Sequence, residues 1–223
     1  MKVLKFGGTS VGTAKSIKKV KDIIANEAKS DRVIVVVSAM TQVTNKLLAA
    51  SELAANGDES YKEITKEIEN KHFEAIRELV VIDQQSGVIA NVKVLLNQLE
   101  DVLNGVYLVR ELSPKTSDYI VSFGESLSSI ILSKSIGAEL VDSKSLISTN
   151  TEHGGATVLY DRTYKKIHEF FESSNSNVFV APGFVASTEE GVTSTLGRGG
   201  SDFSAALYAA GSNAAELQIW TDV

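Results

Sequence analysis

The chain has 223 residues, which is enough for one large domain with a sizeable buried core. Its net charge of -6 argues against a nucleic-acid surface, because such a surface needs clustered basic residues. The lack of cysteine excludes disulfides and thiolate metal sites, and no apolar run approaches the length of a membrane span. Met1-Lys2 leads directly into a predicted strand rather than a signal peptide, so we expect a cytoplasmic protein that binds neither nucleic acid nor membrane.

The first apolar run, Val3-Leu4, stops abruptly at the turn Lys5-Phe6-Gly7-Gly8-Thr9-Ser10, and an amphipathic helix is predicted from about Val11. Glycines let a ligand approach the backbone, a helix start favours an anion, and Lys5 adds a positive charge. The turn therefore fits a phosphate site, but a packing turn that binds nothing explains it equally well. Its spacing matches neither G-x-x-x-x-G-K-[ST] nor G-x-G-x-x-G.

The next stretch predicts a buried strand and then a helical layer. Val33–Val37 is a β-branched run without polar alternation, which is typical of a parallel strand covered on both faces. Ser38 follows it at a carboxyl end, where ligands bind in open α/β sheets. From about Lys46 to Leu112 the periodicity is helical, with breaks expected at Gly57-Asp58 and at Gln85-Ser86-Gly87. His72, among charged residues, is expected at the surface.

A further helical stripe runs past Gly124-Glu125, where the carboxylate either accepts a substrate ammonium at a pocket edge or is merely solvated. Beyond it, Leu140-Val141 and Val178–Phe184 are predicted strands, with a helix around Ile167 between them. His153 and His168 show no metal-ligand spacing, so a structural role is preferred for both. The last predicted strand is 217–223.

A second glycine-rich element, Thr195–Asp202, precedes a helix that Ser201 and Asp202 are expected to cap. Arg198 within it can bind a carboxylate or a phosphate through two parallel hydrogen bonds. Asp202 can cap the helix, hold Lys5 or reach a Mg²⁺ ion, and the sequence leaves these three roles open.

These stretches together resemble the aspartate kinases of the amino-acid kinase superfamily. The matching pieces keep the family order along the chain: Lys5-Phe6-Gly7-Gly8-Thr9-Ser10-Val11, Ser38-Ala39, Thr44-Asn45, Phe123-Gly124-Glu125, Thr195-Leu196-Gly197-Arg198-Gly199-Gly200-Ser201-Asp202 and Trp220-Thr221-Asp222-Val223. The resemblance implies an α/β fold, a three-layer αβα sandwich with a mostly parallel sheet and the active site at the carboxyl ends of the strands. Residues 1–223 would then be an amino-terminal part of the catalytic domain, incomplete at its carboxyl end.

By the same resemblance, the protein phosphorylates the side-chain carboxylate of L-aspartate with MgATP, the first step toward lysine, threonine and methionine. Mg²⁺ is expected to be held through the ATP phosphates rather than by a protein metal site. Lys5 would lie against the transferring phosphates, Asp202 would organise Lys5, and Glu125 would take the aspartate ammonium. The resemblance also implies that Arg198 binds a substrate carboxylate, that Thr44 and Ser38 contact the substrate, and that the Gly199-Gly200-Ser201 backbone lies at the reacting centre. The phosphates would be surrounded by Gly7, Gly8, Thr9 and Ser10. The nucleotide would contact Thr221 and Asp222.

The chain departs from the family in length, because family kinase domains continue beyond the Thr-Asp-Val motif with further nucleotide-binding residues. We therefore expect the aspartate side to be complete, the ATP side to be incomplete and the isolated chain to be weakly active or inactive. The parent protein is expected to be a homo-oligomer, and a fused homoserine dehydrogenase is possible. Two alternatives stay open: a sister kinase acting on acetylglutamate, glutamate or a nucleotide monophosphate, and a non-catalytic binding or assembly module.

Overall fold

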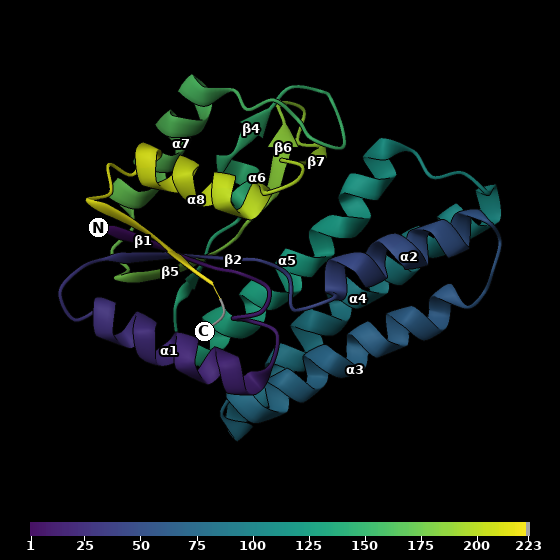
Figure 1. Ribbon diagram of the computed structural model, residues 1–223, viewed down its shortest axis with the longest axis horizontal. Coiled ribbons are helices and arrows are strands. Elements are labelled where there is room, and N and C mark those ends of the chain that lie inside the picture. Colours follow the sequence, from purple (N-terminus) through teal and green to yellow (C-terminus); the bar gives the residue numbers. More distant parts are fainter. Residues whose placement is uncertain (222–223) are drawn as a thin grey trace.

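A parallel sheet forms the centre of the molecule in a computed structural model that describes residues 1–221 (Figure 1). Within these residues the sheet has five strands, and all of its neighbouring strands are parallel. In their order across the sheet they are β3 (Glu139–Leu140), β5 (Val178–Pro182), β2 (Val33–Val37), β1 (Lys2–Phe6) and β8 (Glu216–Trp220). Because all of them point the same way, their carboxyl ends lie along one edge of the sheet.

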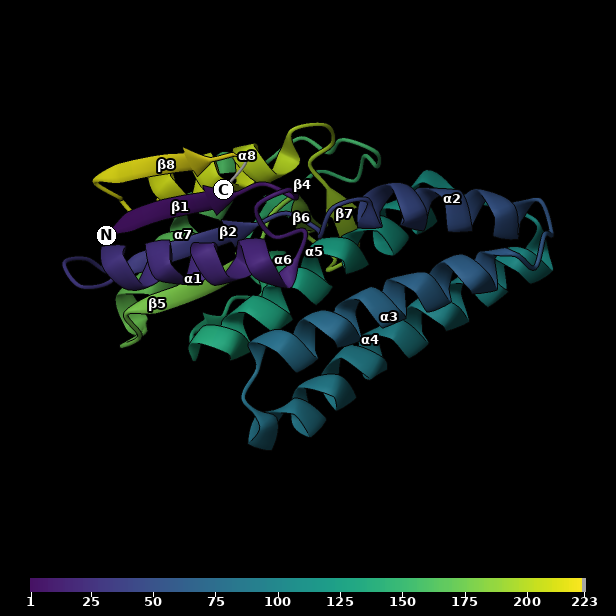
Figure 2. The ribbon, with the colours of Figure 1, turned by 60° about the horizontal axis from the view of Figure 1, so that its bottom comes forward.

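Helices cover both faces of this sheet, which confirms the predicted three-layer αβα architecture (Figures 1 and 2). On one face lie α1 (Ala14–Glu27) and α5 (Pro114–Ile136), and on the other lie α6 (Ser143–Leu146), α7 (Tyr160–Ser173) and α8 (Gly200–Gly211). Side chains of β2 alternate between the two cores: Val35 packs on the α1 and α5 side, and Ile34 and Val36 pack on the α7 and α8 side. Burial on both faces explains why β2 carries no polar alternation.

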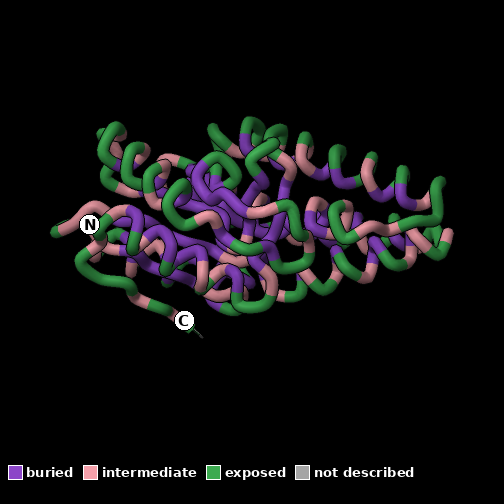
Figure 3. The backbone as a smooth tube through the Cα atoms, turned by 90° about the horizontal axis from the view of Figure 1, so that it is seen from above, coloured by how far each residue is buried: buried purple, intermediate pink, exposed green. Residues whose placement is uncertain are grey.

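The predicted helical layer is a lobe beside the sheet, formed by α2 (Val43–Ala55), α3 (Tyr61–Leu79) and α4 (Ile82–Val109) packed against α5. Figure 3 shows buried positions running through the sheet and continuing into this lobe. The break expected near Gly57-Asp58 is present. The break expected at Gln85–Gly87 is wrong, because α4 continues through these residues. The side chain of Gln85 instead donates to the carbonyls of Arg77 and Val80 at the end of α3, 3.0 and 2.9 Å away.

His72 on α3 is fully buried, so the surface position expected from its charged neighbours in sequence is wrong. Position 72 falls on the face of α3 that packs into the lobe, together with Ile68 and Ile76. Its Nδ1 lies 2.7 Å from the carbonyl of Ile68, and burial lowers its pKa to about 4. His72 is therefore a neutral core residue at neutral pH.

A second, smaller sheet carries the chain toward α8. It consists of β4 (Ser148–Thr149), β6 (Val185–Thr188) and β7 (Thr193–Thr195), in which β6 and β7 form an antiparallel hairpin. No helix in the described part of the chain is long and apolar enough to span a bilayer.

Candidate active site

The two glycine-rich elements meet at the carboxyl edge of the main sheet. Lys5 lies near the end of β1, and α8 starts at the same edge because it leads back to the beginning of the parallel strand β8. The Lys5 Nζ lies 2.7 Å from Oδ1 of Asp202 in the first turn of α8. Of the three roles left open for Asp202, the structure shows this ion pair.

The helix cap predicted for Ser201 and Asp202 is wrong. The N-cap of α8 is Gly199, whose φ of 75° is in the left-handed region, and no side chain caps the helix. The Gly199 carbonyl accepts from the N–H groups of Asp202 and Phe203, both within 3.1 Å. The backbone therefore closes the first turn, and the side chain of Asp202 is available for Lys5.

The opening glycine turn docks against the segment that follows β2. A Cβ on Gly8 would lie 3.0 Å from the carbonyl oxygen of Ala39, and the Thr41 hydroxyl donates to the Gly8 carbonyl across 2.8 Å. Gly8 is thus required for close approach of two backbone segments. The helix expected from about Val11 begins only at Ala14, where Thr13 and Ser16 form a capping box. The N-terminus of α1 is therefore capped by its own side chains, contrary to the expectation of an open helix start beside the glycines.

Glu125 is buried on α5 at a point where that helix passes very close to the end of β2. A Cβ on Gly124 would lie 2.8 Å from the Cβ of Ala39, so glycine at this position permits the contact. The side-chain atom Oε2 of Glu125 is buried and has no hydrogen-bond partner within the described residues. Burial raises the pKa of Glu125 to about 7, while a hydrogen bond from the Ala39 backbone and the charge of Lys5 oppose that rise. Such a carboxyl group gains strongly from a cationic ligand.

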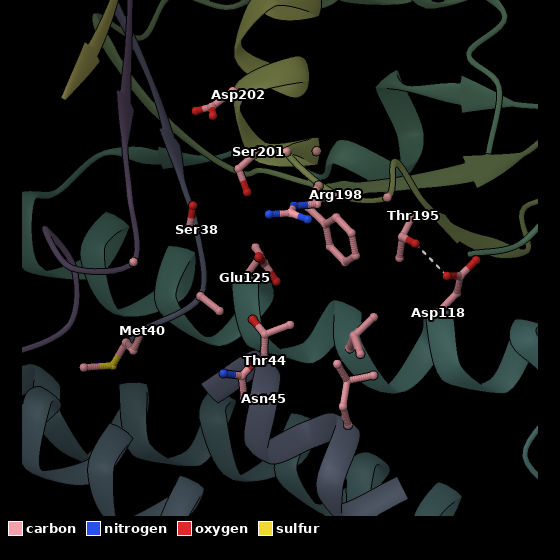
Figure 4. Close-up of a pocket in the computed structure, with 18 of the residues that line it drawn as sticks. Ser38, Met40, Thr44, Asn45, Asp118, Glu125, Thr195, Arg198, Ser201 and Asp202 are labelled. Carbon is pink, nitrogen blue, oxygen red and sulfur yellow. Dashed lines mark hydrogen bonds between the residues drawn. The ribbon is translucent and has the colours of Figure 1, made fainter. Parts of the chain in front are cut away.

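A cavity of about 560 Å³ lies between these elements. Figure 4 shows the labelled side chains of Ser38, Thr44, Glu125, Arg198 and Ser201 turned toward one hollow, with Arg198 opposite Glu125. Thr44 lies in the first turn of α2. Ten of the predicted site residues line this cavity, namely Lys5, Gly8, Ser38, Thr44, Glu125, Arg198, Gly199, Gly200, Ser201 and Asp202.

Four other residues predicted to bind the nucleotide do not line the cavity, namely Gly7, Thr9, Ser10 and Thr221. Thr9 is exposed, Ser10 is buried and Thr221 is exposed. Gly7 donates its N–H to the carbonyl of Trp220 at 3.3 Å, which ties the opening turn to the end of β8. Asp222 lies outside the described residues. Among those described, no group of three or more His, Cys, Asp or Glu side chains could hold a metal ion.

Several residues of the cavity wall were not predicted as site residues, among them Asp118 and Phe184. Asp118 precedes Glu125 by two helical turns on α5, and this spacing was the available signal. Phe184 has a φ of 65°, which is rare for an aromatic residue, and its backbone N–H donates to Ser204 Oγ at 2.8 Å. No sequence pattern predicts that conformation.

The fold and the cavity define an α/β protein that can take up a small charged ligand beyond the carboxyl ends of its parallel strands. A lysine–aspartate pair, a buried carboxyl group and an arginine surround that space. The model of the Amino acid kinase family matches residues 1–223, and the chain belongs to this family. The resemblance inferred from its motifs is thereby confirmed.

Relatives of this chain are aspartokinases. It is 31% identical over 227 residues to a chloroplastic bifunctional aspartokinase/homoserine dehydrogenase 2 of Arabidopsis thaliana, covering 99% of this chain and 25% of that protein. It is also similar to E. coli aspartokinase III in complex with lysine and aspartate, with a TM-score of 0.89, 30% identity and coverage of 100% of this chain and 49% of the other. The same enzyme in complex with aspartate and ADP gives a TM-score of 0.89 at 29% identity. The chain thus spans about a quarter to a half of the length of these relatives.

Proposed function

We propose that this chain forms the aspartate-binding part of an aspartate kinase, which phosphorylates the side-chain carboxylate of L-aspartate with ATP to give 4-phospho-L-aspartate. The observation that carries the proposal is the convergence of Lys5–Asp202, Glu125 and Arg198 on one cavity. A relative supports the proposal, because the E. coli aspartokinase III of the same fold has been solved in complex with aspartate and ADP. On this proposal, residues 1–223 belong to one catalytic domain.

The cavity suits an amino acid with one ammonium and two carboxylates. Glu125 receives the ammonium, because its Oε2 is buried and without a protein partner. Arg198 binds a carboxylate through its planar fork of donors. Thr44, Ser38 and Ser201 supply hydroxyl groups around the remaining oxygens. A ligand lacking the free ammonium leaves Glu125 unpaired and should bind poorly.

The phosphate side of the cavity is formed by Lys5 and by the close-packed turn at Gly8. Lys5 as a whole residue is 7% exposed and carries a point charge at the edge of the cavity, which Gly8 also lines. These features fit a phosphate group. On this proposal MgATP supplies the transferable phosphoryl group, and the ATP phosphates would hold the Mg²⁺ ion. On this proposal the nucleotide is also contacted by Gly7, Thr9, Ser10, Thr221 and Asp222.

The reaction needs no general base, since an ionised carboxylate is already a nucleophile. What the protein must provide is alignment of the aspartate carboxylate and relief of the repulsion between two anions. Lys5 and Arg198 supply positive charge, and the first turn of α8 supplies a positive dipole end. Asp202 holds Lys5 in place. Because the chain spans 49% of the E. coli enzyme that was solved with aspartate and ADP, we expect phosphoryl transfer by residues 1–223 alone to be slow.

The experiment is calorimetric titration of the purified chain with L-aspartate, L-glutamate and N-acetyl-L-glutamate, followed by trapping of the acyl phosphate with hydroxylamine in the presence of MgATP. We expect saturable binding of L-aspartate, weaker binding of L-glutamate and none of the acetylated compound. Equal binding of all three, or of none, would remove the proposed function. In the cell, the product would feed lysine, threonine and methionine synthesis in the cytoplasm, and the protein would work as a homo-oligomer.

A further inference from the structure

Two carboxylates on one face of α5 have opposite environments. Asp118 and Glu125 both line the cavity and are 3% and 5% exposed. The Oε2 of Glu125 is without a partner in the described part of the chain, whereas both oxygens of Asp118 accept hydrogen bonds. Glu125 can therefore bind a ligand, and Asp118 is already committed to the protein.

The partners of Asp118 come from two segments distant in sequence. Its Oδ1 accepts from the Thr195 hydroxyl at 2.6 Å, at the end of β7 (Figure 4). Its Oδ2 lies 2.8 Å from Nδ1 of His153. The backbone N–H of Gly154 lies 3.2 and 3.1 Å from the two oxygens. One buried carboxylate thus joins α5, the loop 150–157 and the strand that leads to Arg198.

The loop 150–157 has little apolar anchorage of its own. Thr151, Glu152, Gly154 and Gly155 are exposed, and Ala156 is the only residue of the loop that belongs to the buried apolar set in the described chain. Polar contacts must therefore determine where the loop lies.

The same loop packs against the turn that carries Arg198. The Ala156 N–H donates to the Thr195 carbonyl at 2.8 Å. A Cβ on Gly197 would lie 3.1 Å from the Cα of Gly155, so the two backbones are in close contact. Any displacement of the loop consequently reaches Gly197, the residue before Arg198.

We propose that Asp118 is a positioning residue for the substrate cavity: by fastening the loop 150–157 to Thr195, it fixes the turn that presents Arg198 to the substrate. This inference rests on the proposed function, because it assigns Arg198 to a carboxylate of the substrate. Asp118 itself makes no contact with the substrate in this role, since its acceptor positions are filled by Thr195, His153 and Gly154.

The test is Asp118→Asn, which keeps the size of the side chain but replaces one acceptor oxygen with a donor. We expect the Kd for L-aspartate to rise roughly tenfold, the factor expected for loss of a charge-assisted hydrogen bond that acts on the site. The Kd for ADP should stay unchanged. Amide exchange should accelerate in 150–157 and in the turn 196–199, but not in α3.

Glu69→Gln is the matched control. Glu69 is also a buried carboxylate, 4% exposed, and accepts hydrogen bonds from Lys66 and Lys93 in the lobe away from the cavity. This variant should lose stability with no change in the Kd for L-aspartate. A merely structural role for Asp118 would produce the same result in Asp118→Asn, and that result would overturn the inference.

The outcomes separate this inference from the proposed function. If the unmodified chain binds no L-aspartate, the proposed function fails and this inference fails with it. If the unmodified chain binds and Asp118→Asn binds equally well, only the inference fails. Should Asp118→Asn not fold, His153→Ala removes one of the three donors from a partly exposed position, with an expected rise in Kd of about threefold. An unchanged Kd in that variant would equally contradict the role assigned to Asp118.

Discussion

The ammonium of Lys5 lies 2.7 Å from the carboxylate of Asp202, although the two residues stand near opposite ends of the chain. The side chain of Lys5 is 9% exposed and that of Asp202 is 56% exposed. The sheet brings them together, because β1 lies next to β8 and α8 precedes β8. The pair therefore links the first strand to the beginning of the last helix at the edge where the cavity opens.

The first prediction concerns Lys5→Ala. Loss of one charge-stabilising group commonly reduces turnover by roughly 10²–10³, by analogy with oxyanion donors. We expect such a fall in transfer of the γ-phosphoryl group from radiolabelled ATP, which detects slow turnover. Folding should persist, because the partner left behind, Asp202, is largely exposed. Lys2→Ala is the control: Lys2 lies on the same strand but pairs with Glu27 at 2.7 Å, at the opposite end. Near-normal rates in Lys5→Ala would exclude Lys5 from the mechanism.

A second prediction is that L-aspartate binding releases a proton near neutral pH. Burial raises the pKa of Glu125 to about 7, so the empty site holds a proton below that pH. An ammonium beside the carboxylate favours its charged form. Binding should therefore be about tenfold weaker at pH 6 than at pH 8, as expected for one linked proton. Calorimetry in two buffers with different ionisation enthalpies measures the release directly. Affinity that does not change with pH would contradict the assignment of the ammonium to Glu125.

Third, Glu125→Gln should stabilise the empty protein at alkaline pH. The pKa of Glu125 rises from 4.5 to about 7 on folding, so this group lowers stability as the pH increases from about 4.5 to 7. The loss amounts to about 3 kcal/mol at pH 8. The variant avoids that loss and should have a larger free energy of unfolding at pH 8, with a smaller gain near pH 4.5, while losing L-aspartate binding.

Glu69→Gln should change the free energy of unfolding at pH 8 in the opposite direction. Lys66 and Lys93 lower the pKa of Glu69 against the effect of burial, so its stabilisation is present above pH 4.5 and is lost as the pH falls below it. Glu69→Gln should therefore destabilise the protein at pH 8. Denaturant unfolding of both variants at pH 8 and near pH 4.5 measures these changes. If both variants change the free energy of unfolding at pH 8 in the same direction, the distinction between the two carboxyl groups is wrong.

A fourth prediction concerns acid sensitivity. Burial lowers the pKa of His72 from 6.5 to about 4, so its stabilisation is complete above pH 6.5 and decreases as the pH falls toward 4. The contribution lost across that range is about 3 kcal/mol. His72→Leu should flatten the decline in the free energy of unfolding between these pH values. If the free energy of unfolding of this variant falls as steeply between pH 6.5 and pH 4 as that of the unmodified chain, the acid sensitivity originates elsewhere.

The fifth prediction compares two helical glycines. A Cβ at Gly124 would lie 2.8 Å from the Cβ of Ala39, whereas a Cβ at Gly105 on α4 meets nothing within 4 Å. Gly124→Ala should cost roughly 1–3 kcal/mol through overpacking and should weaken L-aspartate binding by moving Glu125. Gly105→Ala should stabilise the protein by up to about 1 kcal/mol, the difference in helix propensity. Thermal unfolding distinguishes them, and a stabilised Gly124→Ala variant would show that α5 does not need this close approach.

The sequence by itself determined the fold class and ten of the residues that line the cavity. Continuous β-branched runs such as Val33–Val37 predict strands buried on both faces, and the polar residues after them lie at the carboxyl edge because parallel strands share one direction. Local chemistry singled out Arg198, and the resemblance to the aspartate kinases gave Glu125 its expected role toward the substrate ammonium. Local chemistry did not predict the helical position of Gln85, the burial of His72 or the backbone closure of the first turn of α8. The solvent exposure of a side chain and the acceptor that it reaches depend on which helix packs against it.

Only the tertiary structure decided between competing roles of the same residue type. The residues of the second glycine-rich element left three roles open for Asp202, and the structure pairs its carboxylate with Lys5 across the sheet edge. Asp118 and Glu125 repeat on one helix face, but the loop 150–157 fills the acceptors of the first and leaves the second open to the cavity. A hydrogen bond between distant segments has no periodicity in sequence, since it depends on where the chain returns in space and not on local propensity.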